Sequence, residues 1–332
     1  MTSGATPFRP RVDLHVHLLG AVSDATIARL AARHPGAALH GLDAAGVRAR
    51  RRFHDLASFI AAWLPLCEVV LGAEDVVDAT RDAAAGFARA GVRYAEVRFT
   101  PVSHVRRGAI ESDLLAGLHA GRLVARLEHG VEIAWVLDVP RDLGAVAAMD
   151  TARLAAQAAP RDVVAIDFVG SEHALRPGDH APFAPAADAA RAAGLHVVAH
   201  AGEAAGPWSV AEALDVLGAE RIGHGTRAIE DPALVERLAR ERIPLEVCPT
   251  SNVRLGVVPS IAAHPVGELL RRGLVIALGS DDPVLFDCDL PGEYAEVAAA
   301  FGLDGGALRA LERAAIDAAF LDDAERERLF PA

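Results

Sequence analysis

The sequence of 332 residues contains no lysine, because all 33 of its basic residues are arginine. This absence excludes a Schiff-base lysine, the lysine of a phosphate-binding P-loop, and a carbamylated lysine that bridges two metal ions. Cysteine is scarce as well, with only Cys67, Cys248 and Cys288 at wide spacings. An odd, scattered set does not make a disulfide framework, and it fits a reducing cytoplasm.

A long apolar run is also missing. The most apolar stretch, residues 56–73, is interrupted by Ser58, Pro65 and Glu68. We therefore expect no membrane span there, but a helix that covers a pocket. Met1–Pro10 lacks the apolar core of a secretory signal, which again predicts a cytoplasmic protein.

Positive charge is in deficit. The formal net charge is −12 at pH 7, and the acidic residues are spread along the chain. The sequence therefore has no basic footprint that would indicate binding to nucleic acid or to an anionic membrane. We expect a small-molecule partner, and no feature of the sequence indicates an oligomeric state.

What the sequence does contain is an alternation of short β-branched runs with alanine-rich stretches of helical period. This pattern is typical of a parallel sheet with crossover helices. The expected strands are Val12–His17, Val92–Phe99, Glu132–Val139, Val163–Val169, Leu195–Ala201, Arg221–His224, Leu245–Cys248 and Val275–Ser280. The expected helices between them are Asp75–Ala90, Asp113–Glu128, Leu143–Ala158, Pro185–Ala193, Val210–Leu217 and Pro232–Glu241.

Eight strands with alternating helices predict a (β/α)₈ TIM barrel, an α/β fold. Gly91, Gly194 and Gly273 each follow a helical run, where a left-handed residue commonly ends a helix. Residues 23–74 are too many for a simple loop, so we expect a helical cap inserted after the first strand. From Pro291 the chain indicates terminal helices, and residues 1–332 form one predicted domain.

Histidines and acids stand at the ends of four of these strands, the end where barrel enzymes carry their function. His15 and His17 are two residues apart on a strand, so both point to the same face. The fifth strand ends near His200, and Asp281 follows the eighth. Each histidine alone is readily explained as a core residue. Together, three imidazoles and a carboxylate predict a site for one zinc ion with an open position for water.

A metal with an open position lowers the pKa of its bound water toward neutrality and supplies hydroxide. His224, at the end of the sixth strand, is placed to hold and deprotonate that water, and Glu203 to protonate a ring nitrogen of the substrate. Asp282, beside the expected ligand Asp281, could bind a second heteroatom. The structural alternatives are a core histidine, a solvated carboxylate at a helix start, and an N-cap before Pro283.

These residues lie in segments that resemble the adenosine deaminase family of the amidohydrolase superfamily, and the resemblance runs over nearly the whole chain. The matching segments are Val12–Leu18, Val92–Arg98, His200–Glu203, Arg221–Gly225, Glu246–Pro249 and Asp281–Pro283. The resemblance implies zinc-dependent deamination of an adenine nucleoside to an inosine-type product and ammonia. Cytidine and tRNA deaminases use a Cys-x-x-Cys zinc site that this chain lacks.

The resemblance also assigns roles to individual residues. It implies that zinc is bound by His15, His17, His200 and Asp281. It further implies that Glu203 donates a proton to purine N1, that His224 orients the hydroxide attacking C6, and that Asp282 hydrogen-bonds N7. Gly170, within Asp167–Glu172, would offer its backbone to N3; otherwise it is a turn glycine.

Leu19 is the departure from the family pattern. Adenosine deaminases carry an aspartate there that binds the ribose 5′-hydroxyl, and adenine deaminases of the family carry a glutamate. A buried hydroxyl without a partner costs about 1–3 kcal/mol, so leucine disfavours a free 5′-hydroxyl and tolerates an apolar 5′ substituent. Adenosine, free adenine, aminodeoxyfutalosine, methylthioadenosine and adenosylhomocysteine all remain candidate substrates. The alternative is that Leu19 only packs in the core and another group binds the ribose.

Two hypotheses compete with adenine deamination. One is a metal hydrolase for another bond, such as an ester, an amide or a phosphotriester, although most such enzymes use two metals and a bridging lysine. The other is a barrel that serves as a binding module and keeps its metal for stability. The complete set of acid, base and nucleophile favours an enzyme over a binding module.

Overall fold

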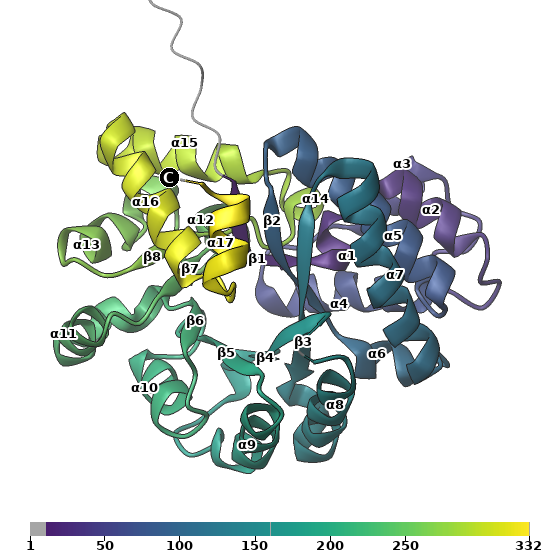
Figure 1. Cartoon of the computed structure of the whole chain (residues 1–332), viewed down its shortest axis with the longest axis horizontal. Helices are drawn as coiled ribbons and strands as arrows, with labels where there is room; N and C mark the ends of the chain where they lie inside the picture. The colour runs from purple at the N-terminus through teal and green to yellow at the C-terminus, as the bar shows by residue number, and fades with distance from the viewer. Residues whose placement is uncertain (1–10, 160, 332) are drawn as a thin grey trace, which may run out of the picture.

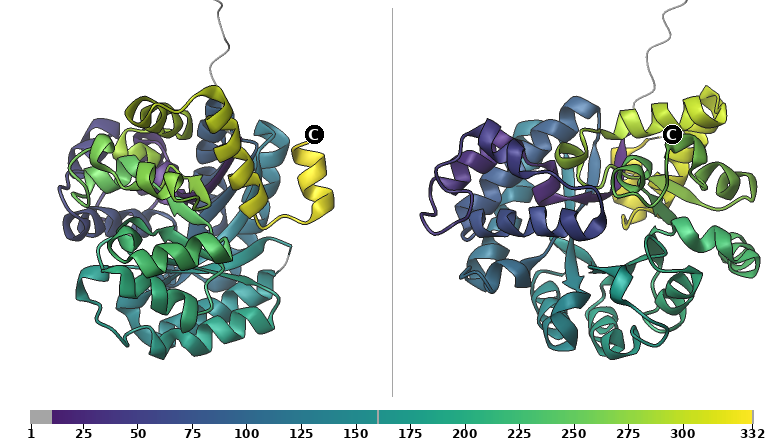
Figure 2. Two further views of the ribbon diagram at one scale, coloured as in Figure 1. Left: turned by 90° about the vertical axis from the view of Figure 1, so that its left-hand side faces the viewer. Right: turned by 180° about the vertical axis from the view of Figure 1, so that it is seen from behind.

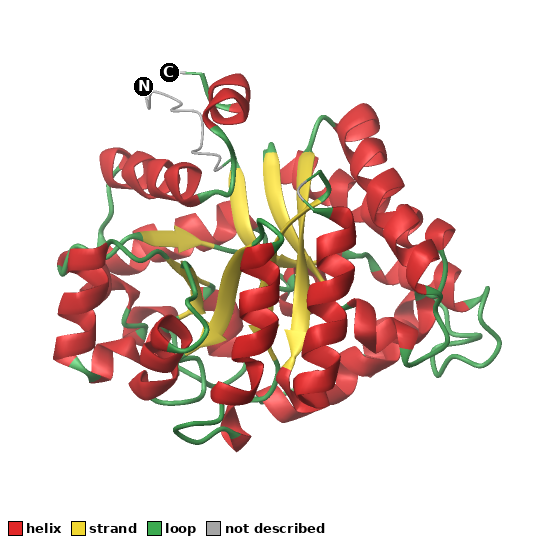
Figure 3. Cartoon of the chain, turned by 60° about the horizontal axis from the view of Figure 1, so that its bottom comes forward, coloured by secondary structure: helices red, strands yellow, loops and turns green. Residues whose placement is uncertain are grey.

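Eight parallel strands form the centre of the part of the chain that the computed structural model describes, residues 11–159 and 161–331. They pair in chain order, and β8 returns to β1 through a parallel bridge between Val16 and Asp281. Figure 3 shows the strands inside a layer of helices. The predicted (β/α)₈ barrel is confirmed. The strands are β1 Val12–His17, β2 Tyr94–Phe99, β3 Glu132–Pro140, β4 Val163–Val169, β5 His196–Ala201, β6 Arg221–His224, β7 Leu245–Val247 and β8 Ile276–Leu278.

The outer helices follow the predicted positions closely. They end where the sequence places glycine: Gly91, Gly194 and Gly273 have φ values of 91°, 78° and 79°, the left-handed region that a residue with a Cβ rarely adopts. The helices of the outer layer are α5 Ala73–Ala90, α7 Glu111–His129, α8 Gly144–Ala158, α9 Ala184–Ala192, α10 Pro207–Asp215, α11 Pro232–Glu241 and α13 Val266–Arg271.

Short helices follow four of the strands within five residues of the strand end, and they shape the mouth of the barrel. They are α1 Leu18–Ala21 after β1, α6 Pro101–Val105 after β2, α12 Pro249–Arg254 after β7, and α14 Pro283–Phe286 after β8. Three of them carry proline in their first turn, where the missing N–H costs no hydrogen bond. The sequence pattern had not indicated these helices, because each is too short to show a helical period.

The segment after α1 is helical, with α2 Asp24–Ala31, α3 Ala44–Arg50 and α4 Leu56–Trp63. The expectation of one helix over residues 56–73 was wrong in its length. Asp55 and Ser58 form a capping box that starts α4, but Pro65 cannot continue an α-helix. The chain passes instead into a 3₁₀ segment, Leu64–Val69.

The two ends of the barrel are covered by different parts of the chain. The C-terminal helices are α15 Leu290–Phe301, α16 Gly305–Ala318 and α17 Asp323–Leu329. The front view and the view from behind put the yellow α17 and the dark blue α4 on opposite faces (Figures 1 and 2). Arg221 donates to the carbonyl of Ala318 over 2.7 Å, and Phe320 N–H donates to Glu96 over 2.7 Å. These bonds attach the C-terminal segment to the barrel interior.

Met1–Pro10, which were expected to lack a secretory signal, lie outside the described residues. Within the described ranges, no helix combines the length and the apolar character that a membrane crossing requires.

Candidate metal and active site

The predicted ligands converge at the strand ends that form the barrel mouth. His15 and His17 come from β1, His200 from β5, and Asp281 from the segment after β8. The Nε2 atoms of His15 and His17 lie 3.8 and 3.5 Å from Oδ1 of Asp281. These separations allow both imidazoles and the carboxylate to share one ion.

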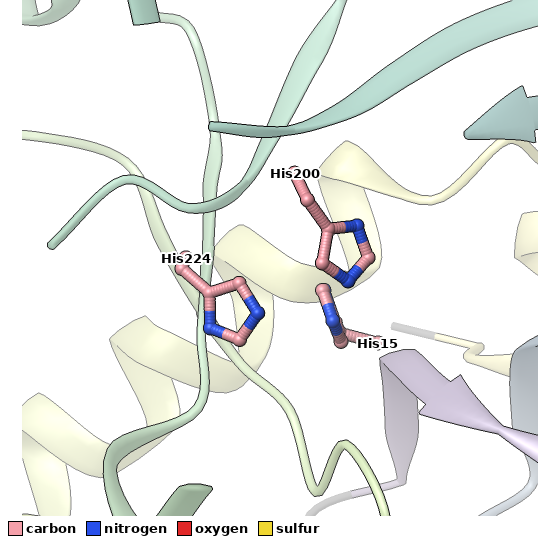
Figure 4. A group of neighbouring side chains, drawn as sticks. All are labelled: His15, His200 and His224. Carbon is pink, nitrogen blue, oxygen red and sulfur yellow. The ribbon is translucent and has the colours of Figure 1, made fainter. Parts of the chain in front are cut away.

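His15 is central to the cluster. Figure 4 shows it beside His200 and His224, with ring centroids 4.6 and 4.8 Å from that of His15. The possible ligand atoms of these three histidines lie within 4.8 Å of one another, and so do those of His15, His17 and Asp281. The four predicted ligands are thus divided between two overlapping sets that share His15.

Each of the three histidines predicted as ligands has a buried carboxylate behind it. Nδ1 of His15 lies 2.9 Å from Glu246, Nδ1 of His200 lies 3.1 Å from Asp167, and Nδ1 of His17 lies 3.4 Å from Asp138. A carboxylate at Nδ1 keeps the ring hydrogen there and leaves Nε2 as a free lone pair for a metal. Such carboxylate–histidine pairs are typical of metal sites.

Arginines hold two of these carboxylates in place. Arg98 donates to Asp167 over 2.6 Å and also to Glu246. Arg221 donates to the other oxygen of Glu246 over 2.7 Å. Both guanidinium groups are buried in the barrel centre. The paired charges make this layer rigid, because a buried charge that loses its partner is costly.

Two of the site residues have a strained backbone conformation. His224 and Asp281 both have φ of 60°, in the left-handed region that non-glycine residues rarely occupy. Such strain occurs mainly where function requires it. Gly279 allows the close packing around His15, because a Cβ at position 279 would lie 2.6 Å from Cβ of His15.

The donor set fits zinc. Nε2 of His15 is buried and has no hydrogen-bond partner among the described residues, which is costly unless something binds it. Three imidazole nitrogens and one carboxylate oxygen are the ligand types that zinc prefers. Cys248 also lies near His224 and Asp281, but burial raises the pKa of its thiol well above the usual range. The raised pKa disfavours the thiolate, the form in which cysteine binds a metal.

Glu203 and His224 face each other beside the ligands, with Oε1 and Nε2 3.8 Å apart. Burial raises the pKa of Glu203 well above its usual range, and the negative charges of Asp281 and Glu172 add to the shift. Both effects favour the protonated form of Glu203. Burial lowers the pKa of His224 to about 3, so its ring is neutral. The pair can supply one acidic proton and one neutral imidazole.

Behind His224 runs a chain of hydrogen bonds that the sequence did not indicate. Asn252 Nδ2 lies 3.2 Å from Nδ1 of His224, and Asn252 Oδ1 lies 3.0 Å from Nε2 of His264. Thr226 donates to the same Oδ1 over 3.0 Å. The chain ends at the backbone N–H of Val266, which donates to Nδ1 of His264 over 3.0 Å.

A cavity of about 260 Å³ opens onto these residues, a size that suits a small molecule. Its polar lining residues are His17, Thr100, Ser103, Asp138, Asp142, His200, Glu203, His224, Asp281 and Asp282. Its apolar lining residues are Leu56, Phe59, Ile60, Trp63, Leu64, Pro140, Leu143, Val169 and Leu255. Helix α4 contributes four of these apolar residues.

Of the remaining predicted site residues, Asp282 lines the cavity, whereas Leu19 and Gly170 do not. Asp282 lines the cavity, and its buried Oδ1 has no partner among the described residues. Leu19 is 2% exposed and belongs to the main hydrophobic core, and it is not among the lining residues. Gly170 is also absent from that lining. It has φ of 109° and lies next to Asp142, whose Oδ2 would be 2.4 Å from a Cβ at position 170.

Sequence reasoning missed the residues that orient the site, Asp138, Asp167, Glu246 and Asn252. The first three are acidic residues inside otherwise apolar strands, and that interruption was the available signal. All three carboxylates are buried. An acidic residue inside an apolar strand therefore indicates a functional group, because a charge is rarely buried unless it is paired or binds a ligand.

Comparisons with known proteins agree with this geometry. Residues 10–331 match the family model for adenosine deaminase. An aminodeoxyfutalosine deaminase of Streptomyces avermitilis is 40% identical over 323 residues, covering 96% of this chain and 89% of that protein. An adenine deaminase of Streptomyces coelicolor is 40% identical over 319 residues, covering 96% and 92%. An amidohydrolase of Burkholderia ambifaria solved with bound Zn superposes with a TM-score of 0.86 at 26% identity, covering 98% and 92%.

Proposed function

This chain belongs to the adenosine deaminase family, and from that premise we propose that it deaminates an adenine nucleoside whose ribose 5′ position carries a substituent with a large apolar part. The protein is a hydrolase of C–N bonds in adenine-type rings and releases ammonia. We propose aminodeoxyfutalosine, a 5′-modified adenosine and the named substrate type of the Streptomyces avermitilis relative.

The observation that carries this proposal is the apolar part of the cavity lining. Phe59, Ile60 and Trp63 of α4 lie there, together with Leu143 and Leu255. A free 5′-hydroxyl placed among these side chains would lose its hydrogen bonds to water, at a cost of about 1–3 kcal/mol. An apolar 5′ substituent would instead gain by leaving water.

We propose that one zinc ion per chain is held by His15, His17, His200 and Asp281. When bound, zinc lowers the pKa of a coordinated water toward neutrality, so that hydroxide is available for attack at C6. Asp138, Asp167 and Glu246 orient the three imidazoles toward the ion. The metal identity is supported by the mixed donor set and by the zinc in the related structure.

The chain's own residues complete the chemistry. Glu203, whose pKa is raised well above its usual range by burial, donates its proton to purine N1 as C6 becomes tetrahedral. His224 holds the attacking oxygen, and Asp282 hydrogen-bonds N7 through its unpartnered Oδ1. The family resemblance further suggests that the backbone of Gly170 contacts N3, although Gly170 is not among the residues that line the cavity. The proton on N1 prevents charge from accumulating on the ring during attack.

Steady-state kinetics on a substrate panel test the proposal. The panel contains adenine, adenosine, AMP, methylthioadenosine, adenosylhomocysteine and aminodeoxyfutalosine, followed by ammonia release and by the spectral change from adenine to hypoxanthine. We expect kcat/KM to be highest for aminodeoxyfutalosine and at least tenfold lower for adenosine. A preference for adenosine over every 5′-modified compound would overturn the proposal, and so would activity confined to free adenine.

Trp63→Ala examines the apolar lining directly. We expect it to raise KM for 5′-substituted substrates severalfold and to change kcat/KM for free adenine little, because in the proposed orientation the 5′ substituent, and not the base, packs against α4. Leu127→Ala is the matched control, because Leu127 is 77% exposed on α7. An equal loss on adenine and on the 5′-substituted compounds would place the substituent elsewhere.

Free adenine is the second candidate. The Streptomyces coelicolor adenine deaminase matches this chain at the same 40% identity, and a cavity that holds a nucleoside also admits the base. The substrate panel decides between the two, because an adenine deaminase would discriminate against every ribosyl compound.

A further inference from the structure

Glu172 is a buried carboxylate that none of the roles above uses. It lies three residues after β4, and 1% of it is exposed. Its Oε1 accepts from the N–H of Gly202 at 3.0 Å and from the hydroxyl of Ser209 at 2.7 Å. Its Oε2 accepts from the N–H groups of Glu203, Ala204 and Ala205 at 2.8, 2.7 and 3.0 Å. Four consecutive backbone amides therefore converge on one side chain.

The loop 202–205 is built to surround this carboxylate. Gly202 has φ of 68°, which turns the chain so that the following N–H groups point inward. Successive amides in such a turn form a concave anion site, because their dipoles add. A negative side chain fills this site far better than a neutral one, since charged hydrogen bonds are about twice as strong as neutral ones.

The second residue of this loop is Glu203. Its backbone N–H is bound to Glu172, while its side chain lines the cavity. Arg227 binds the carbonyl groups of the same loop. Its backbone N–H donates to Gly202 O at 2.7 Å, and its guanidinium donates to Ala204 O at 2.5 Å. Because the backbone is held on both sides, the direction of the Glu203 side chain is set by these partners.

Glu172 also connects two loops of the mouth. It lies two residues after Gly170, and Arg141 joins the same unit by donating to Gly170 O at 3.4 Å and to His200 O at 2.9 Å. Hydrogen bonds therefore link the segment that would contact purine N3 with the segment that carries the acid.

We propose that Glu172 is a positioning residue of the deaminase, which places Glu203 against the substrate ring through the amides of residues 202–205. The proposal rests on the function proposed above, in which Glu203 is the proton donor. Glu172 touches neither the substrate nor the predicted metal ligands, so its effect is exerted through Glu203.

Glu172→Gln tests the proposal in the metal-loaded enzyme with the best substrate of the panel. Glutamine keeps the shape but presents an NH₂ group to amides that are themselves donors. We expect kcat to fall roughly 100-fold, the loss that a displacement of about 1 Å causes. KM should change less than threefold and metal content should stay near that of the wild type. Glu236→Gln, an exposed carboxylate on α11, is the matched control and should keep full activity.

A double-mutant comparison separates positioning from general structural support. If Glu172 acts through Glu203, then Glu172→Gln should lower kcat little when Glu203→Gln is already present. The same fold-loss in both backgrounds would overturn the proposal. So would a kcat within twofold of the wild type for a folded Glu172→Gln enzyme.

Ser209→Ala serves where Glu172→Gln does not fold. It removes one donor to Oε1 and leaves the four amides, so we expect a folded enzyme with a severalfold loss of kcat. That loss should also vanish in the Glu203→Gln background, and its persistence there would contradict the proposal. An absence of deamination by the wild type on the entire panel would instead reject the proposed function, so the two failures are distinguishable.

Discussion

The side-chain NH₂ of Asn252 donates to Nδ1 of His224 across 3.2 Å. The direction of this hydrogen bond follows from a backbone N–H group further along the chain of hydrogen bonds. Val266 N–H can only donate, so Nδ1 of His264 is an acceptor. Burial lowers the pKa of His264 to about 4, so its ring is neutral and carries its hydrogen on Nε2. That hydrogen goes to Oδ1 of Asn252, which turns the amide nitrogen toward His224. The hydrogen of neutral His224 therefore lies on Nε2, facing the cavity.

This arrangement favours one of the two roles expected for His224. An Nε2 that carries hydrogen can donate to the attacking oxygen and hold it in line with C6, but it cannot take a proton from it. We predict that Asn252→Asp lowers kcat by roughly 100-fold or more, because a carboxylate at Nδ1 moves the hydrogen to that side, and a wrong tautomer is severely damaging in catalytic histidines. Nitrogen NMR of labelled histidine should show Nδ1 as acceptor in the wild type. A protonated Nδ1 in the wild type would contradict the assignment.

Substitution of Glu203 should separate proton donation from metal binding. Glu203→Gln keeps the size of the side chain but removes the acidic proton, so we expect kcat to fall by about 10²–10⁴-fold. Zinc content, measured by elemental analysis, should remain near one per chain because Glu203 is not a predicted ligand. Loss of the metal together with activity would show that Glu203 supports the ion instead.

The barrel and its strand ends were predictable because they depend on local patterns. Hydrophobic runs, helix-ending glycines and the spacing of His15 and His17 can all be recognised without knowing which strands are neighbours. The strand limits were less accurate. The eighth strand was expected to reach Ser280 but ends at Leu278, because the chain turns there into the left-handed conformation of Asp281.

The residues that orient the site depend on sheet register, which no local pattern sets. Asp138 and Asp167 lie side by side in β3 and β4, yet 29 positions separate them in the sequence. Asn252 and His264 lie outside the periodic segments altogether. Leu19 shows the converse: its place in the motif predicted contact with the substrate, but the structure puts its side chain in the core, and that contact stays a prediction.

Asp138 should control metal affinity through His17. Its Oδ2 lies 3.4 Å from Nδ1 of His17 and accepts from Thr100 at 2.8 Å, so Asp138→Asn leaves no buried arginine without a partner. Loss of the negative charge weakens the preference for hydrogen on Nδ1 and hence for a free Nε2. We expect zinc to bind about 10–100-fold more weakly, measured by competition with a chelator. Thr100→Val, which keeps the carboxylate, is the control and should have a smaller effect; equal losses would assign the effect to packing.

Glu293 should make the stability of the protein depend on pH. The side chain is buried on α15, where Oε2 accepts from Thr250 N–H at 3.1 Å and Oε1 has no partner among the described residues. Burial raises its pKa from 4.5 to about 7. A carboxyl with a raised pKa in the folded state stabilises the fold fully below pH 4.5, and this contribution is lost as the pH rises through about 7.

Glu293→Gln should therefore flatten the pH profile of the free energy of unfolding. A shift of one pKa unit corresponds to roughly 1.4 kcal/mol of unfolding free energy. The wild type should therefore lose about 3 kcal/mol of stability between pH 4.5 and 8 through Glu293, and the variant should not lose this contribution. Urea unfolding across that range measures the difference. Glu296→Gln, an exposed carboxylate on the same helix, should keep the wild-type slope. Equal slopes for wild type and Glu293→Gln would mean that Glu293 ionises in the folded protein as easily as in the unfolded chain.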